Sequence, residues 1–177
     1  MSEILTYTKK MFDPLNPNPE LIDIRDIAHA LSQLCRANGH YGEFYSVCQH
    51  SLDCCAEAAA RGENVRIQLA CLLHDASEAY LSDVTRPVKA MMPLYLEMEA
   101  PLQEAVWNQY LIQPLTDEER RIVFEIDDCM LYHEFLSHTG YAVAEIPPRM
   151  TGQHSFTFVP FKEAEQAFLD TFYHLSK

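Results

Sequence analysis

The sequence predicts an all-α fold: a single helical bundle with short irregular segments at the N-terminus and late in the chain. Three observations support this prediction. Only five of the 177 residues are glycine, 48% are hydrophobic, and apolar residues recur at spacings of three and four along most of the chain. Because a domain usually takes roughly 100–200 residues, residues 1–177 are expected to share one core.

This periodicity predicts helices along most of the chain. They cover approximately residues 23–36, 46–62, 65–80, 94–110, 116–138 and 161–174. Two of these helices begin with the pattern of a capping box, Ser46 with Gln49 and Thr116 with Glu119. Pro101 is expected to kink or restart the fourth helix, because proline cannot donate the helical hydrogen bond.

The segments between the helices are rich in turn-forming residues. A short strand is expected at residues 4–8, followed by a turn at residues 16–19. The first helix is expected to end at Asn38-Gly39. Residues 140–158 are expected to form a loop or a short hairpin.

The charge of the chain excludes some classes of partner. The formal net charge is −13 at pH 7. Proteins that coat DNA or RNA need net positive charge to displace counterions from the phosphates, and anionic membrane surfaces attract basic segments. We therefore expect neither long nucleic acid nor a membrane as a partner.

The apolar segments and the cysteines indicate a cytoplasmic protein. The chain has no signal-peptide pattern and no run of about 18 apolar residues. The six cysteines lie inside apolar-periodic segments, and none forms a CxxC pair. We expect them to be buried free thiols in a reducing compartment.

Polar residues that can bind a metal occur in the middle of three of the apolar helices. They are His50, His74-Asp75 and Asp127-Asp128. Charged groups on an apolar face are costly unless they are paired or bind a metal. Imidazoles and carboxylates from three helices would form a mixed nitrogen and oxygen site for a divalent ion, with positions open for water and substrate.

An ordinary structural role is the alternative for each of these residues. A single histidine on a helix is more often a core or surface residue than a ligand, and one His-Asp pair is weak evidence. The ordered set, each member on its own predicted helix, favours the metal site. Glu78 lies four residues after His74, so it is expected one turn further along the same helical face. There it could orient or deprotonate a metal-bound water.

The order His50, His74-Asp75 and Asp127 resembles the HD-domain phosphohydrolase superfamily. Members of this superfamily are all-helical, metal-dependent enzymes that cut phosphate esters and anhydrides. The resemblance implies the same fold and a phosphate-containing substrate for this chain.

Shorter motifs resemble particular branches of the superfamily. Residues 74–78, followed by Asp83 and residues 87–89, are similar to the bacterial 5'-deoxynucleotidases. Residues 26–51 resemble a related bacterial and phage branch that includes the phage dATP triphosphohydrolases. The resemblance is strong over about residues 13–89 and weaker afterwards.

The resemblance implies roles for individual residues. The implied metal ligands are His50, His74, Asp75 and Asp127. Asp127 is preferred to Asp128 because its helical position faces the bundle, whereas Asp128 is expected to be a surface carboxylate. Glu78 corresponds to the catalytic acid that works on the nucleophilic water. Asp83 corresponds to a second catalytic acid near the scissile phosphate or the leaving oxygen.

Basic residues at motif positions are candidates for binding phosphate. Arg36 is the strongest, because a guanidinium can grip phosphate oxygens with two parallel hydrogen bonds. Lys89 is second and Arg86 third. His40 could contact phosphate or sugar, or bond within its own loop.

One position departs from the pattern of the relatives. Several of them carry a large aromatic residue directly after the arginine, where it can stack on the base, but Ala37 stands here. Tyr41 or Ile22 could line the base pocket instead, so the preferred base stays open. His133 and Glu134 lie beyond Asp127 but are expected to be surface residues, because the implied ligand set is already complete. A location at the surface is also expected for the side chains of His138, His154 and His174.

The expected function is hydrolysis of a 5'-deoxynucleotide, either a monophosphate that loses phosphate or a triphosphate such as dATP that loses triphosphate. One divalent transition metal ion is expected, and Mn, Co, Fe, Ni or Zn would each suit the ligands. The alternatives are a non-catalytic, metal-stabilised nucleotide sensor and a purely structural helical protein. A homo-oligomer, a dimer or larger, is also expected, with Trp107, Tyr110 and Tyr132 as residues of either the interface or the core.

Overall fold

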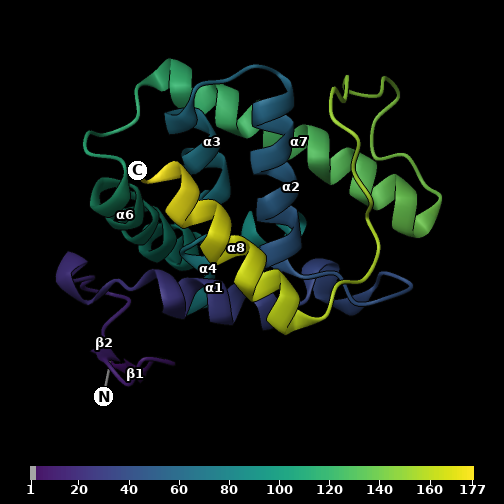
Figure 1. Cartoon of the computed structure of the whole chain (residues 1–177). Coiled ribbons are helices and arrows are strands. Elements are labelled where there is room, and N and C mark those ends of the chain that lie inside the picture. The colour runs from purple at the N-terminus through teal and green to yellow at the C-terminus, as the bar shows by residue number, and fades with distance from the viewer. Residues whose placement is uncertain (1–2) are drawn as a thin grey trace.

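Helices dominate the structure, as the sequence predicts. The computed structural model describes residues 3–177 (Figure 1). Its helices are α1 (Ile24–Gln33), α2 (Val47–Ala60), α3 (Val65–Leu72), α4 (Glu78–Leu81), α5 (Arg86–Lys89), α6 (Pro93–Tyr110), α7 (Asp117–Thr139) and α8 (Phe161–Leu175). The remaining elements are the 3-10 turns η1 (Pro19–Leu21) and η2 (Arg36–Gly39) and the strands β1 (Ile4–Leu5) and β2 (Met11–Phe12).

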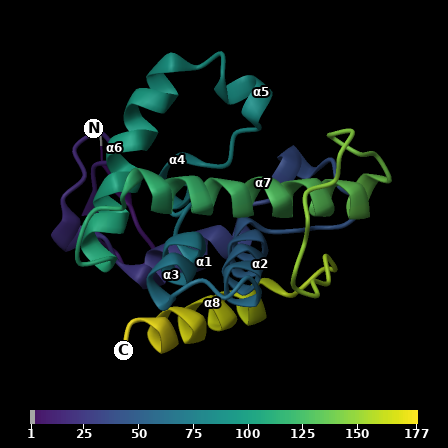
Figure 2. The same ribbon diagram turned by 90° about the horizontal axis from the view of Figure 1, so that it is seen from above.

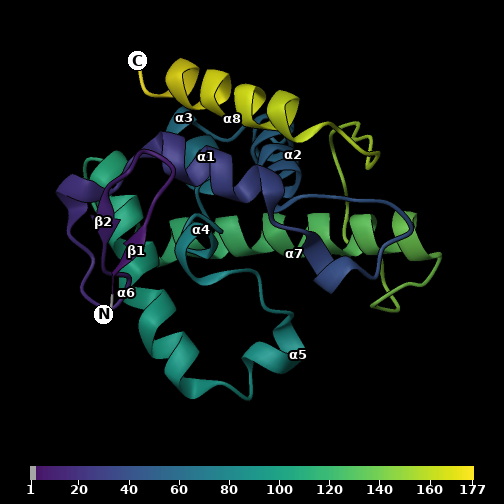
Figure 3. The ribbon, with the colours of Figure 1, turned by 90° about the horizontal axis from the view of Figure 1, so that it is seen from below.

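The long helix α7 lies between two parts of the molecule. On one side α1, α2 and α3 form a layer that α8 covers, and on the other side lie α5 and the first part of α6 (Figures 2 and 3). The short helix α4 packs against α1. Helices α2 and α3 pack against each other, and both pack against α7 and α8. Large side chains fill this contact, among them Leu72, Leu73, Ile126, Met130 and Phe168. Burying each stabilises the fold by about 1.5–3 kcal/mol before entropy is counted.

Local sequence signals set most of the helix ends. Both predicted capping boxes are present, and the hydroxyls of Ser46 and Thr116 accept hydrogen bonds from the amides of Gln49 and Glu119. Pro101 lies inside α6, which runs unbroken from Pro93 to Tyr110.

The first helix ends earlier than predicted. It stops at Gln33 rather than at Asn38-Gly39, because the chain turns into an extended segment that pairs with the residues before α2. The amide of Arg36 donates to the carbonyl of Tyr45 at 2.9 Å, and the amide of Val47 donates to the carbonyl of Leu34 at 3.0 Å. Arg36 therefore lies in the short η2 turn and not on a helix.

The single helix predicted over residues 65–80 is wrong. Helix α3 stops at Leu72, a turn follows, and α4 begins at Glu78. Within the turn the imidazole Nδ1 of His74 lies 2.7 Å from the Cys71 carbonyl oxygen, and the amide of Glu78 bonds the carbonyl three residues back on Asp75. His74 and Glu78 are consequently not one helical turn apart on a common face.

The N-terminal strand β1 is shorter than the predicted strand of residues 4–8, and it forms a hairpin with β2 that docks on α1. Strands β1 and β2 are antiparallel and two residues each. Both the amide and the hydroxyl of Thr8 donate to the buried carboxylate of Asp26, at 2.6 and 2.9 Å. The hairpin is thereby fixed to the first turn of the helix.

Residues 140–160 form a loop, one of the two predicted alternatives, and α2 anchors it. The His154 side chain is 1% exposed, so its expected surface location is wrong. Its two ring nitrogens lie 3.1 Å from carboxylates of Asp53 and Glu57. Glu57 also accepts the amides of Thr151 and Gly152, at 2.9 and 2.8 Å. This cluster holds the loop against the outer side of α2.

The three aromatic residues considered for an interface and most of the cysteines lie in or against the core. Trp107 and Tyr132 are buried within the chain and Tyr110 is partly buried, which favours the core over the interface for these residues. All six cysteines are free thiols and five are buried, as predicted. Within residues 3–177, no helix is both long and apolar enough to cross a lipid bilayer.

Candidate metal centre and adjoining cavity

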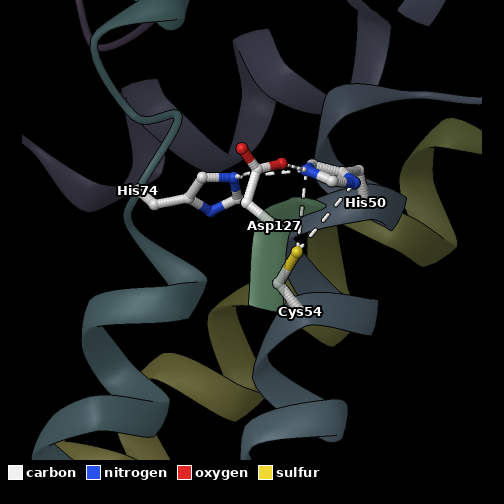
Figure 4. Close-up of side chains that lie close together, drawn as sticks. All are labelled: His50, Cys54, His74 and Asp127. Carbon is white, nitrogen blue, oxygen red and sulfur yellow. Dashed lines mark hydrogen bonds and ion pairs between the residues drawn. The ribbon is translucent and has the colours of Figure 1, made fainter. Parts of the chain in front are cut away.

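Four side chains from three helical regions meet next to α7. His50 and Cys54 are one turn apart on α2, His74 lies in the turn after α3, and Asp127 is on α7 (Figure 4). One donor atom from each lies within 4.8 Å of the donor atoms of the other three, and this cluster could hold a metal ion. Three of the four implied ligands are therefore together.

The fourth implied ligand, Asp75, lies at the edge of the same cluster. Its Oδ2 is 3.3 Å from Nε2 of His74 and 3.7 Å from Nε2 of His50. The two Nε2 atoms are 3.2 Å apart, and that of His50 is 3.0 Å from Oδ1 of Asp127. Metal–nitrogen bonds of about 2.0–2.1 Å place neighbouring ligand atoms about 2.9–3.4 Å apart, so most of these separations suit ligands of one ion.

Hydrogen bonds orient both imidazoles. Nδ1 of His74 faces the Cys71 carbonyl, and Nδ1 of His50 faces the carboxylate of Glu134. These acceptors place one proton of each ring on Nδ1, so that Nε2 points at the cluster and can bind an ion once it gives up its own proton. Such an arrangement is typical of metal-binding histidines.

Charge in the cluster also fits a cation. Burial raises the pKa of Asp127, but hydrogen bonds from His50 and His74 outweigh this and hold it well below its ordinary value. Burial likewise raises the pKa of Asp75, and the charge of His74 lowers it to a net value below the ordinary one. Both carboxylates are thus ionised. A bound divalent cation would replace protons on the two imidazoles between them.

Cys54 differs from the other members of the cluster. Its sulfur lies 3.6 Å from Nε2 of His50, but burial raises the pKa of the thiol well above its ordinary value. Because a metal binds the thiolate rather than the thiol, Cys54 would have to lose its proton to join the ligands, whereas Asp75 is already ionised.

The two implied catalytic acids lie beside the cluster. Both Glu78 and Asp83 line the adjoining cavity. Burial raises the pKa of Glu78 well above its ordinary value, and the charges of Asp75 and Asp83 raise it further. Its Oε2 is buried without a hydrogen-bond partner. Burial also raises the pKa of Asp83.

Three of the four candidate phosphate-binding residues line the cavity. Arg36 is buried, with its guanidinium 3.4 Å from Asp75. Lys89 lies 3.4 Å from Glu78 and 2.6 Å from Glu99. His40 is exposed and lies outside the cavity lining, so the structure does not bring it to the site.

Arg86 bridges α5 to α7 across the cluster. It contacts Asp127 at 2.6 Å through Oδ2 and Asp128 at 2.5 Å. Asp127 therefore faces His50 with one oxygen and Arg86 with the other. The Asp128 side chain is 61% exposed, as predicted for a surface carboxylate, although it is ion-paired.

A cavity of about 960 Å³ extends from the cluster along α7. Tyr41 lines it, whereas Ile22 is buried in the core and does not. Ala37 also lines it, with a left-handed backbone (φ 52°), a conformation that costs an alanine about 1–2 kcal/mol. The volume lies near the upper end of the roughly 300–1,000 Å³ of small-molecule sites.

Sequence reasoning missed Glu134, which was expected at the surface. Its side chain is completely buried and contacts both His50 and Arg36. The spacing carried a usable signal, because Glu134 lies seven residues after Asp127, or two helical turns along the same face.

Two curated proteins are similar to this chain. It is 36% identical over 115 residues to the uncharacterized protein YfdR of Escherichia coli, covering 65% of this chain and 62% of that protein. It is 44% identical over 103 residues to the uncharacterized protein RCAP_rcc00048 of Rhodobacter capsulatus, covering 55% and 52%. The matches thus span between about half and three-fifths of these relatives. No protein-family model matches the chain.

Proposed function

We propose that the protein is a metal-dependent phosphohydrolase of the HD-domain type that acts on a 5'-deoxynucleotide. The observation that carries the proposal is the convergence of two imidazole Nε2 atoms and two ionised carboxylates beside a cavity with basic side chains. The motifs at residues 74–78 and 26–51 support the same assignment.

The proposed ligands are His50, His74, Asp75 and Asp127, which suit Mn, Co, Fe, Ni or Zn. A divalent ion held by them supplies Lewis-acid polarisation of the phosphoryl group and lowers the pKa of a coordinated water. The turn after α3 places His74 and Asp75 side by side, so both can serve the same ion.

Glu78 is the proposed proton acceptor. Its unpartnered Oε2 can take a proton from the attacking water, and burial raises the pKa of this carboxyl, which makes it a stronger proton acceptor. Lys89, 3.4 Å from the other oxygen, holds the carboxylate in place. Asp83 is the proposed second acid, near the leaving oxygen.

The charge of the cavity favours a monophosphate over a triphosphate. Seven acidic side chains line it: Asp75, Glu78, Asp83, Glu99, Glu104, Asp127 and Asp128. Four basic side chains line it: Arg36, Arg86, Lys89 and Arg120. Each basic group already pairs with a carboxylate. Even with a divalent ion, little positive charge remains to neutralise three phosphates.

The direct test is a screen of deoxynucleoside mono- and triphosphates with added Mn²⁺ or Co²⁺, with dAMP and dATP included. We expect release of phosphate from a monophosphate and none from a His74→Ala blank. Triphosphate release from dATP would reverse the preference for a monophosphate. Absence of turnover on every nucleotide, with metal bound, would exclude the proposed activity and leave the sensor alternative.

A further inference from the structure

Glu134 lies directly behind the candidate metal centre. It is on α7, its side chain is 0% exposed, and its two oxygens face different partners. One oxygen contacts Nδ1 of His50 in a hydrogen bond. The other lies 3.3 Å from Nε of Arg36.

The first partner of Glu134 is His50, a member of the candidate metal cluster. Because Nδ1 of His50 is held by Glu134, Nε2 of the same ring is directed at His74 and Asp127. A carboxylate behind a metal-binding imidazole fixes the ring and makes its nitrogen a stronger donor.

The second partner of Glu134 is Arg36, a proposed phosphate-binding residue. Arg36 is buried in the η2 turn, where it lines the cavity and reaches Asp75 with its NH1 group. Its Nε and the Glu134 oxygen lie at ion-pair distance without an aligned hydrogen bond, so charge attraction holds them together. Without this carboxylate, the guanidinium would lose its fully buried counter-charge.

A buried carboxylate is costly unless it is paired, and Glu134 is paired with one residue of each half of the site. We propose that Glu134 is a positioning residue that couples ion binding at His50 to phosphate binding at Arg36. The proposal rests on the proposed function, since it takes His50 as a metal ligand and Arg36 as a phosphate-binding group. A purely structural ion pair would contribute to folding and leave both affinities unchanged.

The test measures two affinities of the full chain without any turnover. The first is for Co²⁺, followed by its visible absorption. The second is for inorganic phosphate at saturating Co²⁺, followed by calorimetry. The variant is Glu134→Gln, which keeps the shape but removes the charge, and Glu125→Gln on the exposed side of the same helix is the matched control.

We expect Glu134→Gln to weaken Co²⁺ binding by about 10–100-fold and phosphate binding by about 5-fold or more. Both affinities should stay unchanged in Glu125→Gln. Wild-type affinity for either ligand in a folded Glu134→Gln protein would overturn the coupling. If that variant does not fold, Glu134→Asp keeps the charge but is one methylene too short to reach both partners, and the same pair of losses is expected.

The proposed activity and the coupling can fail independently. If the wild type binds Co²⁺ and phosphate but hydrolyses no nucleotide, the activity is wrong and the two affinities still decide the role of Glu134. If the wild type hydrolyses a nucleotide and Glu134→Gln binds both ligands normally, the activity stands and the coupling is wrong.

Discussion

The two walls of the cavity are built differently. One wall carries His74 and Asp127, and their cluster partner His50 lies on α2 outside the cavity lining. All three are on or next to helices that pack into the core, and the two imidazoles are almost completely buried. The other wall includes residues of the segment 82–92, among them Arg86 and Lys89. Figure 3 shows α5, within this segment, on the side of α7 that faces away from α1, α2 and α8. Arg86 is 55% exposed, and ion pairs connect it to α7.

This difference separates the fixed parts of the site from the adjustable ones. A ligand on a packed helix can move only if the core rearranges, which dense packing resists. Exposed ion pairs contribute only about 0.2–1 kcal/mol each, so the segment of residues 82–92 can separate from α7 at small cost. The ion would therefore meet a preformed set of ligands next to the fixed Arg36, while Arg86 and Lys89 can adapt to the substrate.

The largest loss of metal affinity is expected from a substitution at Asp127, on the packed wall of the cavity. Asp127→Asn removes a charged ligand, so Co²⁺ affinity should fall more than the roughly 100-fold seen when a supporting residue is lost. Equilibrium dialysis measures it. The neighbouring Asp128→Asn is the control and should bind Co²⁺ as the wild type does. Equal losses in both variants would contradict the assignment of Asp127.

Glu78→Gln should separate catalysis from metal binding. The variant keeps the shape of the side chain but cannot accept the proton of the attacking water, so kcat should fall by about 10²–10⁴-fold. Co²⁺ affinity should change little. A variant with full turnover would exclude Glu78 as the base, and a wild type without turnover would favour the sensor alternative.

The loop of residues 140–160 is anchored to α2 through Glu57, and the stability of the fold should depend on pH through this carboxylate. Burial raises the pKa of Glu57, but hydrogen bonds from Arg61, Gly152 and Thr151 lower it to about 2, against an ordinary value of 4.5. A lowered pKa stabilises the fold above the ordinary value and loses this contribution as pH falls from 4.5 towards 2.

We therefore expect Glu57→Gln to lower the free energy of unfolding at neutral pH by about 3 kcal/mol, because the carboxyl pKa falls from 4.5 to about 2 on folding. Urea unfolding of both proteins over pH 3–7 measures it. The difference between them should shrink as pH falls. A difference independent of pH would show that lost packing, rather than the charge, causes the destabilisation.

The smallest effect is expected at the adjustable wall. Arg86→Met removes the bridge from α5 to α7 and should lower the free energy of unfolding by less than about 1 kcal/mol. Hydrogen exchange of the amides in residues 82–92 should accelerate, while that in α2 should not. Unchanged exchange in residues 82–92 would mean that other contacts hold this segment.

The sequence allowed prediction of the features that depend on local signals. The helical class, both capping boxes and the free cysteines follow from spacing and composition, and the structure confirms them. The order of His50, His74 and Asp127 along the chain predicted a cluster that the structure brings together.

The features that depend on tertiary contacts could not be predicted in this way. The break after Leu72 brings His74 and Asp75 to Asp127 and His50, contacts that helical periodicity does not reveal. The burial of Glu134 depends on partners 84 residues away at His50 and in the η2 turn at Arg36. Similarly, the burial of His154 depends on Asp53 and Glu57, which lie far away in the sequence.

The reactivity of the buried thiols can be used to measure how often the fold opens locally. Five cysteines, Cys48, Cys54, Cys55, Cys71 and Cys129, are closed to solvent in the folded chain. A thiol reagent can therefore modify them only during transient unfolding, and the labelling rate at each site measures how often its surroundings open. Cys54, 3.6 Å from the metal-facing nitrogen of His50, should be shielded further when an ion binds. Labelling in the presence and absence of metal would thus follow occupancy of the site without any substrate.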